Sequence, residues 1–357
     1  MKKKVLVAPL DWGLGHASRC IPLITALLKE GVEVHLGGSG KSILLLREYF
    51  PDLPYHDLPA YDVQYTSGKY QVWKILLQLP AILKTIREEH RTLNRLIKEH
   101  SFSAVISDNR YGLWSKEIYS VILCHQIQIP LSYALLSKWV NAVHVRYLNR
   151  FDVTWIPDVQ GDRSLAGRMS HASIMPRNHQ YLGTLSRFQL EEAKPMPTAY
   201  DVLCVISGPE PQRTMFEEEL RDVFQGLDQR VCLVQGKPGP REIKEEGNMT
   251  VINHLPSTEL QQLLLSSTYV ISRSGYSSLM DYAALGLKKV GLIPTPGQPE
   301  QEYLARRMEE KGFSTQFQQG ELNWEEMKGR MEEVGGFRSI EKLSVDIPDE
   351  FWDRLKS

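Results

Sequence analysis

Near its beginning the chain carries a glycine-rich segment whose polar residues could do acid–base chemistry. It reads Asp-Trp-Gly-Leu-Gly-His-Ala-Ser-Arg over residues 11–19. Gly13 and Gly15 let the backbone turn sharply and approach a ligand closely. A helix that begins here would offer free N–H groups to an anion or a polar sugar. His16, whose imidazole ordinarily titrates near ~6.5, is the candidate general base. A tight turn whose histidine caps the helix is the alternative.

A second glycine segment, at residues 272–278, has the composition of a phosphate-binding turn. Its hydroxyl and backbone N–H groups could hold a phosphate. Asp281 follows in the expected helix, where a carboxylate could accept both hydroxyls of a ribose. Serines that only cap a helix are the alternative. The candidate nucleotide-sugar-binding residues of this half are Arg273, Ser274, Gly275, Ser277, Ser278, Asp281, Glu300 and Gln301.

Other polar residues follow short apolar runs that read as buried strands. Asp108 comes after one such run and could orient His16 or act as the base itself. An ordinary turn residue is equally consistent with its position. His125 follows the next run and is a weaker candidate.

A further turn follows an apolar run in the second half of the chain. Ser207 and Gly208 could approach the phosphate or the sugar of a donor, and Arg213 could pair with phosphate. The neighbouring prolines are also consistent with a plain loop.

The stretch 270–312 resembles the C-terminal domain of family 28 glycosyltransferases, such as the MurG-type enzymes. That family has an S-G-x-[ST] turn after a strand, an acidic residue, A-A-x-G, and a proline segment ending in [EQ]-Q-x-x-N-A. The sequence departs from it at Leu304, where Asn is usual, and at Asp281, where Glu is commoner. The matching residues are Ser274, Gly275, Ser277, Asp281, Ala283, Ala284, Gly286, Pro294, Glu300, Gln301 and Ala305.

The first glycine segment is similar to a different group of enzymes. Its G-x-G-H-x-x-R pattern resembles the loop of hydrolases of the pseudaminic acid pathway, which cleave UDP from a diacetamido sugar nucleotide. The two resemblances are sharp over residues 11–31 and 270–312. Together they imply the GT-B architecture, with the acceptor in the N-domain, the sugar nucleotide in the C-domain and catalysis between them.

The elements that must position these residues alternate between apolar runs and amphipathic helices. This order predicts an α/β fold of two doubly wound Rossmann-like domains with an interdomain cleft. We expect an N-terminal domain over 1–187, a linker over 188–200 and a C-terminal domain over 201–357, whose last helix could return to the N-domain. The expected strands are 4–8, 32–36, 104–107, 121–124, 153–156, 181–183, 202–206, 230–234, 250–252, 269–271 and 290–293, and the expected helices include 17–30, 257–266 and 277–285.

Residues 70–100 predict a long helix, broken or kinked near Pro80. Its apolar residues alternate with basic ones, as on the membrane-facing patch of the MurG-type enzymes. Acidic residues, namely Glu88, Glu89 and Glu99, dilute that positive charge. A helix with one core-facing side is therefore favoured, and weak peripheral membrane contact is a minor hypothesis.

The composition bears on the possible partners, the state of the cysteines and the location of the protein. The chain has 357 residues, 24% of them charged, and a formal net charge of −1, which does not indicate a nucleic-acid partner. Its four cysteines show no metal spacing and predict reduced thiols. The apolar run 5–10 contains Pro9 and is too short for a signal peptide, so we expect a cytoplasmic protein.

These observations predict a glycosyltransferase that uses a UDP-sugar and an unknown sugar, lipid-linked or small-molecule acceptor. We expect no cofactor and no metal, because the chain contains no D-x-D pair to hold a metal on a diphosphate. His16 and Asp108 are the expected catalytic residues. A nucleotide-sugar hydrolase and a non-catalytic nucleotide-sugar-binding protein are the alternatives.

Overall fold

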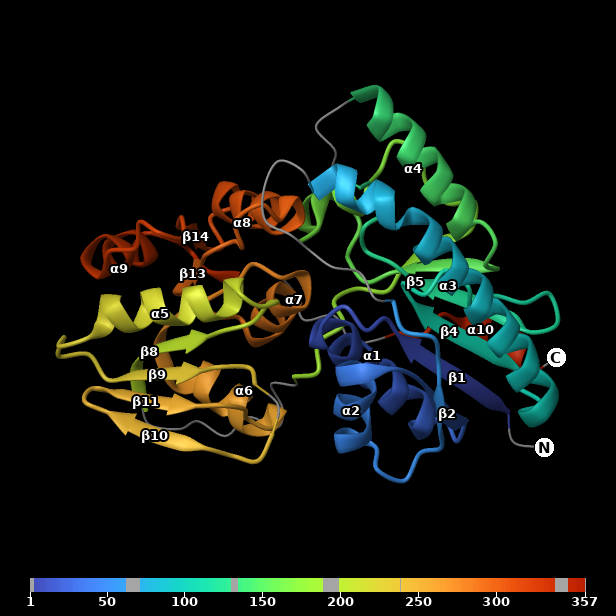
Figure 1. Ribbon diagram of the computed structural model, residues 1–357, viewed down its shortest axis with the longest axis horizontal. Coiled ribbons are helices and arrows are strands. Elements are labelled where there is room, and N and C mark those ends of the chain that lie inside the picture. Colours follow the sequence, from blue (N-terminus) through green and yellow to red (C-terminus); the bar gives the residue numbers. More distant parts are fainter. Residues whose placement is uncertain are drawn as a thin grey trace. The chain divides into compact units, whose positions relative to one another are not determined.

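The computed structural model describes residues 3–61, 71–129, 134–188, 199–237, 239–337 and 346–356, and only the backbone of 71–77 and 134–136. The chain forms two compact units (Figure 1). Unit 1 comprises Met1–Arg187 and Leu343–Ser357, and unit 2 comprises Phe188–Lys342. Residues 189–198 of the predicted linker lie outside the described part of the chain.

Unit 1 is built on a seven-stranded parallel sheet with the strand order β3-β2-β1-β4-β5-β6-β7. Crossover segments join its strands, as parallel pairing requires, and most of these segments contain a helix. The strands are β1 (Lys4–Pro9), β2 (Glu33–Gly38), β3 (Tyr55–Asp57), β4 (Ala104–Asp108), β5 (Tyr119–Leu123), β6 (Val153–Ile156) and β7 (His179–Tyr181). The helices are α1 (Leu14–Lys29), α2 (Gly40–Tyr49), α3 (Gln71–His100), α4 (Ala134–Leu148), the 3₁₀ turns η1 (Gly161–Arg163) and η2 (Gly167–Met169), and α10 (Asp349–Lys356).

Unit 2 repeats this design with the strand order β10-β11-β9-β8-β12-β13-β14. All its strand pairs are parallel except β10 with β11. The strands are β8 (Tyr200–Val205), β9 (Val231–Val234), β10 (Ile243–Glu246), β11 (Met249–Ile252), β12 (Ser267–Ser272), β13 (Val290–Leu292) and β14 (Thr315–Gln316). The helices are α5 (Gln212–Phe224), α6 (Ser257–Ser266), α7 (Tyr276–Leu285), α8 (Pro299–Glu310) and α9 (Trp324–Glu332). The predicted fold class of two Rossmann-like domains is confirmed.

The inner residues of the central strands are mostly apolar, as is typical of parallel sheets that are covered on both faces. Val5, Leu6, Val7 and Ala8 of β1 are all fully buried. One face of this sheet packs against the second half of α3, which contributes Leu93, Leu96 and Ile97 to the core cluster. The apolar faces of the strands therefore dictate which sides of the helices turn inward.

The C-terminal helix α10 belongs to unit 1. Residues 343–357 of the predicted C-terminal domain therefore lie in unit 1 and not in unit 2. Figure 1 shows this helix, coloured red, among the blue and cyan elements of unit 1. Phe351 is 1% exposed, and its ring lies 5.2 Å from the ring of Trp155 on β6. Burial of this aromatic pair fastens the end of the chain to the first sheet.

Helix α3 is one helix from Gln71 to His100, with Pro80 inside it. The helix is therefore not broken near Pro80, and the alternative of a kink stays a prediction. Within the described part of the chain, no helix is long and apolar enough to cross a membrane.

Glu89 of α3 faces the protein interior and does not dilute a surface charge as predicted. Its Oε1 accepts a hydrogen bond of 2.8 Å from Nη1 of Arg110, and both side chains are completely buried. Its Oε2 accepts hydrogen bonds from the hydroxyl of Tyr61 and the backbone N–H of Gly112. Arg110 also donates to the carbonyl of Pro9, at the end of β1. The pair therefore links α3 to the loops beyond β1 and β4.

We predict that Glu89→Ala lowers the free energy of unfolding by about 3–5 kcal/mol, because it leaves the Arg110 guanidinium buried without its counter-charge. Urea unfolding measures this loss. Glu88→Ala is the matched control, since Glu88 forms an exposed pair with Lys84 at 3.8 Å and its loss should change stability by about 0.5 kcal/mol or less. Equal effects of the two variants would show that the buried pair does not stabilise the unit.

Candidate functional site

In unit 1 the strand order reverses between β1 and β4. Ligands of doubly wound sheets bind beyond the carboxyl ends of the strands at such a reversal. Pro9, the last residue of β1, lies in register with Asp108, the last residue of β4. The loop after β1 and the carboxylate of Asp108 therefore occupy the same end of the sheet.

The loop after β1 is anchored by the beginning of α2. The backbone N–H of Ser42 donates to the Asp11 carboxylate at 3.2 Å, and the Ser42 hydroxyl donates to the carbonyl of Leu10 at 3.0 Å. Helix α1 then begins after Gly13, whose φ of 138° favours glycine. No side chain caps this helix, so the structure does not support His16 as a capping residue.

His16 instead joins a buried polar cluster with Asp108, Arg19 and His125. Its Nδ1 lies 3.2 Å from Oδ2 of Asp108. Arg19, one turn further along α1, donates hydrogen bonds to both carboxylate oxygens of Asp108. Its Nε donates to Oδ2 at 2.7 Å, and its Nη2 donates to Oδ1. Arg19 Nη1 lies 3.0 Å from Nδ1 of His125, which follows β5. The structure thus brings both expected catalytic residues together.

The charges of this cluster favour an ionised aspartate and a neutral histidine. Burial alone would raise the pKa of Asp108, but Arg19 and His16 outweigh it and hold the pKa at about 2. Burial lowers the pKa of His16 from its usual 6.5, and Arg19 lowers it further, against the opposing effect of Asp108. His16 is therefore a proton acceptor at neutral pH, and 17% of its side chain remains exposed.

Arg19 also competes for the ring nitrogen that Asp108 contacts. Its Nη2 lies 2.9 Å from Nδ1 of His16, so Nδ1 can either accept from Arg19 or donate to Asp108. Only the second arrangement leaves Nε2 without a proton and able to act as a base. Arg19 was not among the predicted site residues. Its spacing of three from His16 places both residues on one helical face and could have revealed it.

In unit 2 the strand order reverses between β8 and β12, and the predicted donor-binding turns follow these two strands. Val205 of β8 lies in register with Ser272 of β12, so the Ser207–Gly208 turn and the Ser274–Gly275 turn emerge side by side. The loop after β13 joins them, because the N–H of Ile293 donates to the carbonyl of Ser272 at 2.8 Å. Three loops therefore meet where a nucleotide would bind in such a sheet.

The predicted arginines of this region hold loops together. Arg273 is 1% exposed and donates to the carbonyls of Ile293, Pro294 and Gln212. Arg213 donates to Glu210 with Nε at 2.7 Å, and it also contacts Glu217. Both guanidinium groups are engaged by the protein itself.

Gln301 and Ser274 connect the loop after β13 to the turn after β12. The Ser274 hydroxyl donates to the carbonyl of Gln301 at 2.8 Å, and Oε1 of Gln301 accepts from the N–H of Thr295 at 2.9 Å. Gln301 and Ser274 thus shape the loops, and Glu300 directly precedes Gln301 on α8.

Helix α7 begins directly after the Ser274–Gly275 turn. Gly275 is its N-cap and no side chain caps it, so the alternative that Ser277 and Ser278 only cap the helix is wrong. Ser277 and Ser278 are partly exposed in the first turn, whereas Asp281 is 7% exposed and lies one turn deeper. Backbone N–H groups in the first turn of a helix can receive an anion.

Comparison with known proteins agrees with this arrangement. Residues 216–334 match the glycosyltransferase family 28 C-terminal domain. A relative from Methanosarcina mazei, described as an uncharacterized glycosyltransferase, is 23% identical over 328 residues, which cover 87% of this chain and 84% of the relative.

Two solved structures show the same fold. The spinosyn forosaminyltransferase has a TM-score of 0.65 at 12% identity, with complete coverage of both chains. MurG of Acinetobacter baumannii has a TM-score of 0.56 at 13% identity, covering 100% of this chain and 99% of MurG. The fold is therefore that of the GT-B glycosyltransferases, and the findings together support a glycosyltransferase. They do not reproduce the resemblance of the first loop to the hydrolases.

We predict that the imidazole of His16 titrates below pH 6.5 and that its neutral form carries the proton on Nδ1. The shift follows from burial and from Arg19, and the tautomer follows from the ionised Asp108 beside Nδ1. Nitrogen-15 NMR of the histidine side chains measures both properties, and His16→Gln assigns the resonance. A neutral ring with its proton on Nε2 would contradict the base assignment.

Proposed function

We propose that the protein transfers a sugar from a nucleoside diphosphate, preferably UDP, to an acceptor hydroxyl, with His16 as the general base and without a metal ion in the reaction. The observation that carries this proposal is the cluster of His16, Asp108 and Arg19 at the strand reversal of unit 1. The family 28 match over 216–334 and the GT-B fold support the choice of reaction.

In the proposed step, Nε2 of His16 takes the proton of the acceptor hydroxyl. The acceptor oxygen forms a bond to the anomeric carbon of the donor as the bond from that carbon to the diphosphate oxygen breaks. The nucleoside diphosphate leaves with the electron pair of that bond. Asp108 receives a hydrogen bond from Nδ1–H and stabilises the imidazolium that forms, and Arg19 keeps Asp108 ionised and in place.

For the donor, we propose the three loops at the strand reversal of unit 2. Ser207, Gly208 and the first turn of α7 would meet the diphosphate, and Asp281 would accept from the ribose. We expected Arg213 and Arg273 to help neutralise the phosphates, but the protein already engages both guanidinium groups. The proposal therefore assigns the phosphate charge to backbone N–H groups at the beginning of the helix.

The sugar, the acceptor and any peripheral membrane contact stay open predictions. The apolar residues of α3 that suggested membrane contact include side chains at 72–76 that the structure does not describe. Hydrolysis of the donor and binding without turnover are weaker alternatives, because the family match and the relatives are glycosyltransferases.

We predict that Asp281→Ala weakens UDP binding by about 1–3 kcal/mol, the scale of a charge-assisted hydrogen bond. Calorimetry measures the affinity, and melting temperatures show that each variant is folded. Because Asp281 is buried, Asp281→Asn is the second variant, and it should weaken binding less because its amide oxygen still accepts. Equal affinities of the wild type and both variants for UDP would show that Asp281 does not bind the donor.

We predict that His16→Ala leaves UDP affinity within about twofold and lowers kcat by ~10²–10⁴, the usual loss on removing a general base. UDP affinity and kcat respond differently because His16 would act on the acceptor hydroxyl. Turnover of the donor, measured with and without EDTA, should be the same in the wild type. A His16→Ala enzyme with near-normal kcat would reject the base, and loss of activity in EDTA with recovery in magnesium would reject the metal-free step.

A further inference from the structure

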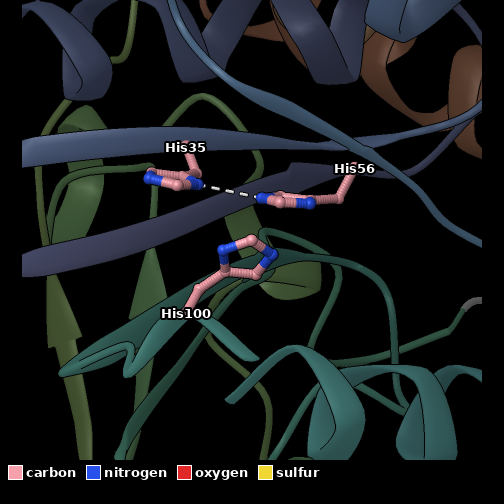
Figure 2. Close-up of side chains that lie close together, drawn as sticks. All are labelled: His35, His56 and His100. Atoms are coloured by element: carbon pink, nitrogen blue, oxygen red, sulfur yellow. Dashed lines mark hydrogen bonds between the residues drawn. The ribbon is translucent and has the colours of Figure 1, made fainter. Parts of the chain in front are cut away.

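Three histidines that are far apart in the sequence meet on one face of the unit 1 sheet. His35 lies on β2, His56 on the edge strand β3, and His100 is the last residue of α3. Register places His56 opposite Gly37, two residues beyond His35, so both rings project from the same side of the sheet. Figure 2 shows the three rings gathered at this point.

The nitrogen atoms of this cluster are close enough to share one ion. Nδ1 of His35 lies 2.9 Å from Nε2 of His56, and one ring nitrogen of each histidine lies within 4.8 Å of the others. Zinc binds imidazole nitrogen at about 2.0–2.1 Å, which places tetrahedral ligands about 3.3 Å apart. Modest rotation of the rings therefore brings all three lone pairs onto one ion.

A carboxylate orients the most buried ring. Nε2 of His35 lies 3.1 Å from Oε1 of Glu33, which is itself paired with Lys4 at 3.1 Å. A proton on Nε2 that is donated to Glu33 leaves Nδ1 with a lone pair directed at His56. Metal-binding histidines commonly donate their second nitrogen to a carboxylate in this way.

The surroundings also favour a cation. His100 closes a helix of 30 residues, and the carboxyl end of a helix carries partial negative charge. The ring of Phe102 lies 5.0 Å from that of His35 and covers one side of the cluster.

We propose that His35, His56 and His100 bind one divalent transition metal ion, zinc by preference, which ties the end of α3 to strands β2 and β3. Three neutral imidazoles with no thiolate suit zinc, cobalt, nickel or copper better than magnesium or calcium. A water molecule would complete the tetrahedron. Within the described part of the chain this is the one group of three or more residues of metal-binding type within reach of a common ion.

This site differs from the proposed catalytic site in place and in purpose. His16 and Asp108 lie at the carboxyl ends of β1 and β4, whereas His35 pairs with Leu6 in the middle of β1. The ion would stabilise the contact of α3 with strands β2 and β3. Its binding therefore does not depend on sugar transfer, and the proposed transfer step still involves no metal.

The test is zinc binding to the full chain after treatment with EDTA and removal of the chelator. We expect one zinc ion per chain with a dissociation constant below about 1 μM, a tetrahedral visible spectrum with cobalt, and a melting temperature raised by roughly 5 °C at a hundredfold excess over that constant. Failure of the wild type to bind zinc would overturn the proposal.

The variants His56→Gln and His100→Gln should each weaken zinc binding by a hundredfold or more, and both positions are partly exposed and tolerant of glutamine. Glu33→Ala should weaken it about tenfold by releasing His35. His179→Gln, which changes a partly exposed histidine of β7, is the matched control and should bind zinc as the wild type does. Zinc bound equally by His56→Gln, His100→Gln and the wild type would reject the site. Unchanged kcat in His56→Gln would show that the metal site stabilises the unit and takes no part in catalysis.

Discussion

In each unit the order of parallel strands reverses between two central neighbours, and both candidate sites depend on this constraint. Helices that leave adjacent strands at a reversal pass to opposite sides, so the loops beyond the strand ends are left open to a ligand. In unit 1 the reversal brings the α1 loop beside Asp108. In unit 2 it brings the Ser207–Gly208 turn beside the beginning of α7. Residues about 90 positions apart, such as His16 and Asp108, meet because their strands pair.

The buried Arg19–Asp108 pair has two consequences for chemistry at the first reversal. It offsets the desolvation of a carboxylate that is completely buried, so Asp108 remains ionised. It also places a permanent positive charge beside His16, which weakens that imidazole as a base but keeps it neutral at physiological pH. The same guanidinium that makes Asp108 available therefore limits how strongly Asp108 can activate His16.

Sequence patterns were sufficient where the physical signal extends over several residues. The strand at 153–156 and the helix at 257–266 were predicted with the bounds that the structure shows. Strand β3 has three residues and β14 has two, too few for a periodicity, and β10 is fully exposed and has no apolar run. Pro80 was expected to break or kink α3, and the helix continues through it without a break.

Some features of the candidate sites could likewise be predicted from the sequence, and others could not. Glycine turns at strand ends are local features, and the sequence located them. The direction in which a long side chain points is a tertiary property, so the inward-facing Arg273, Arg213 and Glu89 could not be recognised. The histidine cluster has no sequence signature at all, because strand pairing and the length of α3 alone bring its members together.

We propose that one transfer reaction uses the loops at both strand reversals, and the release of nucleotide from the donor tests this proposal. The purified protein would be screened across sugar nucleotides with and without a pooled set of hydroxyl acceptors. If the proposal holds, at least one UDP-sugar releases UDP only when an acceptor is added, and a glycosylated product forms. Release at the same rate without any acceptor would contradict it in favour of hydrolysis, and donor binding without release would contradict it in favour of a non-catalytic protein.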